Sequence, residues 1–250
     1  MKHVPPAPPA LGERDGLAYA LFEPEGEPSG GVVILHGAGS AKESHFDFAR
    51  TCRERGLAAL AFDARGHGRS EGVFGPDAFD DVVAMCALMR EHAPRVAVRG
   101  SSMGGFSAIQ AAATEGAGVA AVVAGQMATT AATEDILLWG LRSGRIDGFE
   151  AAPLSVLELW LESLDTTAAA ASLGPETALL LLHAQGDEQV PFTISQELHE
   201  AAADPKRLLL VPGGHHRSLQ HDMEMQAASL RFIQDAVGVR TVARRGARRD

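Results

Sequence analysis

The chain has 250 residues, of which 46% are hydrophobic and 22% charged, and this is long enough for one domain with a sizeable core. Its formal net charge of −10 argues against a nucleic-acid partner, because phosphate binding requires a basic face. The longest uninterrupted apolar run, Val82 to Met89, is far too short to span a membrane. The Pro-rich start has no apolar run typical of a secretory signal, so we expect a soluble, cytoplasmic protein without a membrane partner.

Short apolar runs alternate along the chain with amphipathic helical stretches. These runs are nearly continuous in hydrophobicity, which is typical of strands covered on both faces of a parallel sheet. We predict strands over Gly31–Leu35, Leu57–Phe62, Arg95–Val98, Val119–Ala124, Ala178–Leu182 and Arg207–Val211. We predict helices over Lys42–Arg55, Asp77–His92, Met103–Thr114, Thr193–Ala203 and His221–Val237. Strands that alternate with helices indicate an α/β fold with a mostly parallel, doubly wound sheet.

One interval between two late strands, from Met127 to Pro175, contains no predicted strand. It holds helical patterns around Glu134–Arg142 and Pro153–Ser163, and its roughly fifty residues exceed an ordinary connection between strands. We therefore predict an inserted helical lid over residues 127–175. A pair of crossover helices packed on the sheet is the alternative.

The remaining residues divide into a core and two ends. We predict that residues 17–126 and 176–238 form the α/β core. Residues 1–16 and 239–250 are Pro-rich and Arg-rich, respectively, and we expect them to be flexible termini.

A candidate nucleophile lies in the sequence Gly100-Ser101-Ser102-Met103-Gly104, which follows a predicted strand and opens a predicted helix. In this context a G-x-S-x-G pattern indicates a sharp turn that exposes the serine, and the flanking glycines relieve crowding. Ser102 has a glycine two residues to either side, whereas Ser101 would have Arg99 and Met103 there. We predict Ser102 as a catalytic nucleophile; a small-residue turn without catalysis is the alternative.

A serine hydroxyl needs a base, and the base needs an acid that orients it. A recurring arrangement places the acid and then the histidine after the serine in sequence, each in a loop that follows a strand. Asp187 meets this requirement, because it follows the strand predicted over Ala178–Leu182 and is preceded by Gly186. We predict Asp187 as the acid. Glu188 is the competing candidate, although the side chains of adjacent residues should point apart. The other alternative is that Asp187 is a turn residue without a catalytic role.

Two adjacent histidines follow the last predicted strand, in the segment Pro212-Gly213-Gly214-His215-His216. The loop must leave the strand and turn on glycines before it presents an imidazole, and this register favours His216 as the catalytic base. His215 is the alternative; if His216 is the base, His215 becomes a rim residue that can contact substrate. With His221 they form no ligand pattern typical of a metal site, so we expect neither a metal nor another cofactor.

An oxyanion hole needs two backbone N–H donors. We predict the amide of Met103 as one, because it directly follows Ser102 and opens a helix whose N-terminal end favours negative charge. The other is predicted at Ala38, in the Gly-containing segment His36-Gly37-Ala38-Gly39-Ser40 that follows a strand. An ordinary glycine turn is the alternative for this segment.

The predicted lid is rich in large apolar residues, which suggests a hydrophobic acyl or aryl group in the substrate. Among them we predict Trp139 and Trp160 as substrate-binding residues. Helix packing alone could account for most of these apolar positions.

Five segments together resemble the α/β-hydrolase family: LHGAGSAKESH, FDARGHGRS, GSSMGG, HAQGDEQVP and PGGHHRS. The resemblance runs from about Leu17 to Val237. It implies the α/β-hydrolase fold and a serine hydrolase that cleaves a small-molecule carboxylic ester through an acyl-enzyme intermediate. HGAGSAKES with a short helical insertion resembles bacterial feruloyl-esterase-like enzymes and the dienelactone-hydrolase-like group, although a Cys is the usual nucleophile in the latter.

Other functions remain open within this resemblance. An acyltransferase, a thioesterase or a peptidase would use the same three residues. A non-catalytic ligand-binding protein of the same fold is a further alternative, but it would not require the complete set of these residues. No oligomeric state is predicted.

Overall fold

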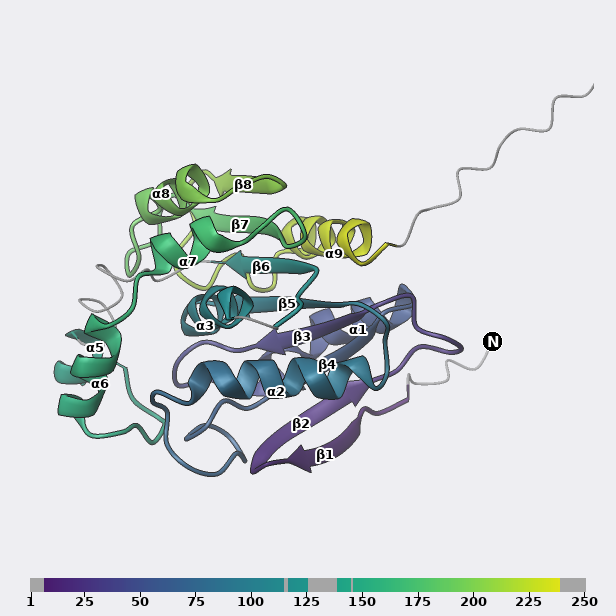
Figure 1. The fold of residues 1–250 in the computed structure, drawn as a ribbon, viewed down its shortest axis with the longest axis horizontal. Coiled ribbons are helices and arrows are strands. Elements are labelled where there is room, and N and C mark those ends of the chain that lie inside the picture. Colours follow the sequence, from purple (N-terminus) through teal and green to yellow (C-terminus); the bar gives the residue numbers. More distant parts are fainter. Residues whose placement is uncertain (1–6, 115–116, 126–138, 145, 239–250) are drawn as a thin grey trace, which may run out of the picture.

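The computed structural model describes residues 7–114, 117–125, 139–144 and 146–238. In this part of the chain, eight strands form one sheet in the order β1-β2-β4-β3-β5-β6-β7-β8 (Figure 1). The strands are β1 (Ala10–Arg14), β2 (Leu17–Phe22), β3 (Gly31–Leu35), β4 (Ala58–Phe62), β5 (Val96–Ser101), β6 (Ala121–Gly125), β7 (Ala178–Ala184) and β8 (Lys206–Val211). β1 and β4 each pair antiparallel with β2, and from β4 to β8 every neighbouring pair is parallel.

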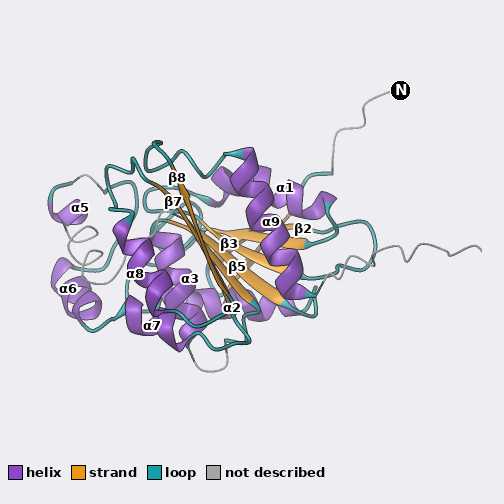
Figure 2. Ribbon diagram, turned by 90° about the horizontal axis from the view of Figure 1, so that it is seen from above, coloured by secondary structure: helices purple, strands orange, loops and turns teal. Residues whose placement is uncertain are grey.

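Helices cover both faces of this sheet (Figure 2). The helices are the 3-10 helix η1 (Lys42–His45), α1 (Phe46–Glu54), α2 (Ala78–Arg90), α3 (Met103–Ala113), α5 (Trp139–Arg142), α6 (Leu154–Glu162), α7 (Thr166–Ser172), α8 (Thr193–Ala201) and α9 (Met223–Val237). Helices α1 and α9 lie on one face of the sheet, and α2, α3, α7 and α8 lie on the other (Figure 2).

The alternation of side chains along a strand explains the two cores. On β3, Val32 and Ile34 pack with Phe48 of α1, whereas Val33 and Leu35 pack with the residues of α2 and α3. Because helices cover both faces, nearly every residue of the central strands is buried and apolar. The predicted doubly wound, mostly parallel α/β sheet is confirmed.

The start of the chain corrects one expectation. Residues 1–16 were expected to be flexible, but Ala10–Arg14 forms strand β1, which pairs with β2. The pattern missed this hairpin because β1 is an edge strand with exposed side chains and therefore lacks a continuous apolar run. Residues 239–250 lie outside the described part of the chain.

The predicted lid interval contains three described helices. Helices α5 and α6 lie beyond the carboxyl ends of the parallel strands (Figure 1), whereas α7 packs against α3 and α8 in the layer that covers the sheet. The segment before α6 is joined to the core by backbone hydrogen bonds: Glu150 N–H donates to Gly66 O (2.8 Å) and Phe74 N–H to Glu150 O (2.9 Å). The first part of the predicted lid lies outside the described residues. Of the helices described, none combines the length and the apolar character needed to cross a membrane.

Candidate active site

Ser102 lies on a sharp turn between β5 and α3. Its backbone has φ 52° and ψ −121°, a conformation that non-glycine residues rarely adopt and that often marks functional sites. The flanking glycines are required by close backbone contacts. A Cβ at Gly100 would collide with the backbone of Gly104, and a Cβ at Gly104 would lie 2.5 Å from His36 O. The predicted strand–turn–helix is therefore present, with Ser102 at its apex.

The loops after β7 and β8 bring Asp187 and His216 to this serine. His216 Nε2 lies 3.0 Å from Ser102 Oγ, and His216 Nδ1 lies 2.8 Å from Asp187 Oδ2. A carboxylate is only an acceptor, so Nδ1 carries the proton and the lone pair of Nε2 faces the serine hydroxyl. This is the hydrogen-bonded order that a serine nucleophile, its base and an orienting acid require.

Asp187 is held by several donors besides His216. Its Oδ1 accepts from the N–H groups of Gln189 (2.8 Å) and Val190 (2.9 Å). On the other side, His183 Nε2 lies 3.4 Å from Oδ2. Burial by itself would raise the pKa of Asp187, but hydrogen bonds from His183, His216 and Val190 outweigh it and hold this pKa well below its usual value. Asp187 is thus a fixed, ionised partner for the imidazole.

Glu188 and His215, the alternatives to Asp187 and His216, do not contact Ser102 in the hydrogen-bonded chain. Glu188 Oε2 accepts from the backbone N–H of His216 (3.1 Å), so it holds the histidine loop rather than the ring. His215 is exposed, and its Nδ1 accepts from Arg217 N–H at 3.2 Å. The structure therefore brings Asp187 and His216, and not their neighbours, to Ser102. The roles of Glu188 and His183 were missed, because their partners are distant in sequence or belong to the backbone.

The segments that carry the two predicted oxyanion donors, Met103 and Ala38, both lie next to Ser102. Met103 begins α3, so its N–H has no acceptor within the helix. The loop after β3 approaches from the other side, since a Cβ at Gly37 would lie only 3.4 Å from Ser102 Cβ. His36 orients this loop: Ala64 N–H donates to its Nε2 (3.0 Å), so Nδ1 is protonated and donates to Gly37 O (2.7 Å).

A cavity of about 260 Å³ opens next to Ser102 and His216. Its described lining comes from four places: the loop after β3, the turn between β5 and α3, the loops after β7 and β8, and the start of the segment that follows residue 145. The lining residues are Gly37, Ala38, Gly39, Ser40, Ser101, Ser102, Ile146, Asp147, Gln189, His216, Arg217 and Gln220. This cavity is where a substrate can meet the nucleophile.

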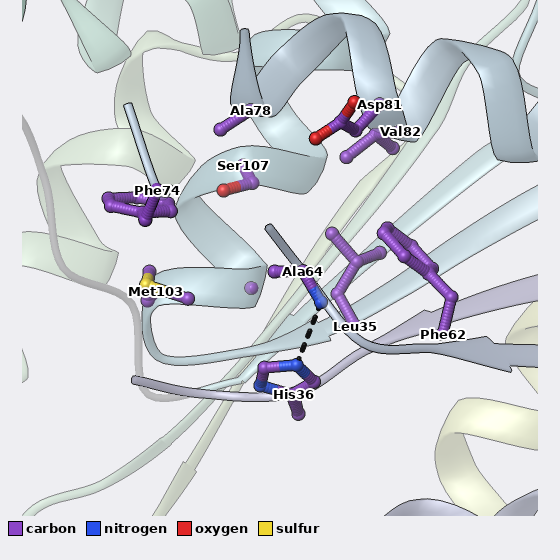
Figure 3. Close-up of a pocket in the computed structure, with 11 residues that line it drawn as sticks. Leu35, His36, Phe62, Ala64, Phe74, Ala78, Asp81, Val82, Met103 and Ser107 are labelled. Atoms are coloured by element: carbon purple, nitrogen blue, oxygen red, sulfur yellow. Dashed lines mark hydrogen bonds between the residues drawn. The ribbon is translucent and has the colours of Figure 1, made fainter. Parts of the chain in front are cut away.

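A second, smaller cavity is lined in part by Met103, the residue after the nucleophile (Figure 3). Leu35, Phe62, Phe74 and Val82 line most of it, and Asp81 and Ser107 point toward it (Figure 3). Its volume of about 10 Å³ admits no more than a single water molecule. It therefore cannot hold a substrate.

None of the three predicted substrate-contact residues is among the described residues that line the larger cavity. Trp160 packs against Phe74 and Phe79, with ring centroids 5.6 and 5.3 Å apart. Trp139 is 53% exposed on α5, and His215 is also exposed. Of the two tryptophans, Trp160 thus packs with other aromatic side chains of the core, which is the alternative interpretation of the apolar lid positions. No group of at least three His, Cys, Asp or Glu residues suited to a metal ion occurs in the described ranges.

Comparisons with known proteins agree with this architecture. Residues 26–138, which include Ser102, match the family described as serine aminopeptidase, S33. An uncharacterized protein, YfhR of Escherichia coli (strain K12), is 26% identical over 74% of this chain. The match spans only 62% of the length of that relative.

Two solved structures are similar over nearly their whole length. Est1E from Butyrivibrio proteoclasticus, solved with ferulic acid bound, has a TM-score of 0.73 at 20% identity, covering 91% of this chain and 99% of its own. A thermostable carboxyl esterase from Bacillus coagulans, solved with glycerol, has a TM-score of 0.73 at 17% identity, covering 92% and 98%. The chain has the α/β-hydrolase fold.

Proposed function

We propose that this protein is a serine hydrolase that cleaves a small carboxylic ester through an acyl-enzyme intermediate. The observation that carries the proposal is the hydrogen-bonded chain from Ser102 Oγ to His216 Nε2 and from His216 Nδ1 to Asp187. The family match supports a hydrolase, and esterases are among the proteins with the same fold. A binding protein would need neither the strained serine nor the ordered imidazole.

The mechanism follows from the positions of these groups. His216 Nε2 takes the proton of Ser102 as Oγ attacks the ester carbonyl carbon, and the N–H groups of Met103 and Ala38 stabilise the oxyanion. The C–O bond to the alcohol breaks, and His216 returns the proton to the leaving oxygen. Water then attacks the acyl-enzyme with His216 as base, releasing the acid and restoring Ser102. Asp187 stabilises the imidazolium in both halves of the reaction.

We also propose that residues 127–175 form a lid over this site. Its described part supplies Ile146 and Asp147 to the cavity wall. Since α7 packs with the helices that cover the sheet, the covering function belongs to the part that precedes it.

The test uses Ser102→Ala. We expect the variant to lose turnover of a short p-nitrophenyl ester and labelling by a fluorophosphonate, while the wild type shows both. Ser101→Ala is the matched control, because Ser101 lines the same cavity but makes no hydrogen bond to His216. Retention of turnover and labelling in Ser102→Ala would contradict the proposal.

Peptide hydrolysis is a second candidate, for two reasons. The matching family is described as a serine aminopeptidase, and the carboxylate of Asp147 at the cavity wall could attract a substrate amine. Amino-acid p-nitroanilides separate the two functions: faster turnover of these amides than of matched amino-acid esters would favour the peptidase.

A further inference from the structure

The cavity next to Ser102 is polar rather than apolar. Ala38 and Ile146 are its aliphatic side chains, whereas Ser40, Gln189 and Gln220 present hydroxyl and amide groups. A long acyl chain or an unsubstituted aryl group would gain little binding free energy in such a cavity, because these groups are stabilised by burial against apolar side chains. The substrate should therefore carry polar groups of its own.

Arg217 is the cation among the described residues of this wall. It directly follows His216, and its backbone N–H donates to His215 Nδ1, which fixes the start of its side chain. Its guanidinium makes no hydrogen bond or ion pair with the part of the chain that the structure describes. An arginine left without a carboxylate at a catalytic cavity has five N–H donors free for an anionic ligand.

A second positive charge lies behind the same side of the cavity. Arg99 of β5 is buried, stacks over the ring of Phe48 at 4.2 Å and makes no ion pair within the described ranges. Burial lowers the pKa of Arg99 to about 10, so the side chain stays charged at neutral pH. A small void links Arg99 to Ser101 and Gln220, which also line the main cavity. In this weakly screened interior its field adds to that of Arg217.

The carboxylate of Asp147 does not neutralise Arg217. The two residues come from different walls, and no ion pair joins them in the structure. The carbonyl of Asp147 lies close to the backbone of Gly39, since a Cβ at Gly39 would lie 2.5 Å from it. Asp147 therefore borders the side of the Gly37–Ser40 loop, and Arg217 the side of the histidine loop.

We propose that Arg217 binds an anionic group, a carboxylate, on the ester that this site cleaves. This inference rests on the proposed function and names the substrate class of the same site. The anion can belong to the acyl part or to the alcohol part of the ester; the chemistry of recognition by a guanidinium is the same in both.

The experiment uses two matched pairs of esters. Monophenyl succinate with phenyl butyrate places the carboxylate on the acyl part, and 4-acetoxybenzoate with phenyl acetate places it on the alcohol part. The kcat and KM values of wild type and Arg217→Gln are measured for all four. The ratio between the two proteins cancels differences in intrinsic reactivity between the esters.

In at least one pair, we expect Arg217→Gln to lower kcat/KM for the anionic ester about two- to fivefold more than for its neutral partner. The loss should appear mainly in KM, the magnitude is that of an exposed charge pair, and added salt should reduce it. Arg231→Gln, an exposed arginine on α9, is the matched control and should change neither ratio. Asp147→Asn should keep the preference for the anion.

Equal effects of Arg217→Gln on both members of each pair would overturn the inference, and so would a preference that depends on Asp147 instead.

Protection against fluorophosphonate labelling gives a readout without turnover: benzoate or succinate should protect wild type better than the matching amides, and Arg217→Gln should lose this difference. If Ser102-dependent labelling and neutral-ester hydrolysis persist while both anion effects are absent, the inference alone fails. If no labelling or hydrolysis occurs at all, the proposed function fails and takes the inference with it.

Discussion

Gly66→Ala tests whether backbone contacts hold the cavity wall in place. Gly66 has φ 74°, and an added Cβ would overlap the carbonyl oxygen of Glu150 and lie 3.1 Å from Phe74 N. The overlap can be relieved only by moving the segment that contains Glu150, because its clashing partner is backbone and not a flexible side chain. That segment begins at Ile146 and Asp147, which line the cavity.

The magnitude follows from two contributions. A non-glycine residue in the left-handed region costs about 1–2 kcal/mol. The displacement also weakens two backbone hydrogen bonds, from Glu150 to Gly66 (2.8 Å) and from Phe74 to Glu150 (2.9 Å). Each has a net value of about 0.5–1.5 kcal/mol. We expect Gly66→Ala to lower the free energy of unfolding by about 2–5 kcal/mol.

Gly72→Ala is the matched control, because Gly72 has φ 76° but its added Cβ would meet only the side chain of Arg65, at an ordinary 3.6 Å. It should lose only the backbone contribution of about 1–2 kcal/mol. Urea unfolding measures both variants, and KM for phenyl acetate should rise in Gly66→Ala alone. If the two variants lose the same stability and keep the same KM, the backbone contact does not position the wall.

Three further results are expected. Asp187→Asn should lower kcat for a p-nitrophenyl ester by about 10³- to 10⁴-fold, because an amide disrupts the tautomer of His216; a change below tenfold would contradict the role of Asp187. Since the folded-state pKa of Asp187 is depressed, its ionised form stabilises the fold above the unfolded value of about 3.9, and this contribution is lost as pH falls further. In urea unfolding, the free energy of unfolding of wild type should therefore exceed that of Asp187→Asn by its full amount at pH 7, and this difference should shrink below about pH 4. A difference that stays constant with pH would contradict the stabilising role of ionised Asp187. Lys42→Met should lower the free energy of unfolding by about 3–5 kcal/mol, because it leaves the buried carboxylate of Asp63 without the ammonium group that lies 2.6 Å away. Adding Asp63→Asn to the same chain should recover part of this stability, since it removes the unpaired charge.

The central sheet could be predicted because both of its faces are covered. Strands such as β3 and β4 are apolar at every position, and that pattern does not depend on knowing which elements are neighbours. The hairpin of β1 and β2 was missed for the opposite reason. Its outer strand is exposed, and its place is set by pairing with β2, which a local pattern does not reveal.

The positions of Ser102, Asp187 and His216 could be predicted from register, since glycines and strand ends restrict where such residues stand. The residues that line the cavity could not be predicted in this way. Large apolar side chains such as Trp139 and Trp160 suit helix packing as well as substrate binding, and the described lining of the cavity consists mostly of small and polar residues from several loops. Arg217 directly follows His216, but a single arginine in a loop belongs to no sequence motif that would predict its place at the cavity.

The backbone pairing of Glu150 with Gly66 and Phe74 also bears on how this site could be redesigned. Hydrogen bonds between main-chain atoms do not depend on side-chain identity, so the path of this short segment should survive exchange of its side chains. Asp147 can then be varied freely, whereas Ile146, which packs against the core, can be exchanged for other apolar residues. A library of variants at these two positions would change the side chains that line the cavity. We expect more of its members to fold than in a library of changes in the helices.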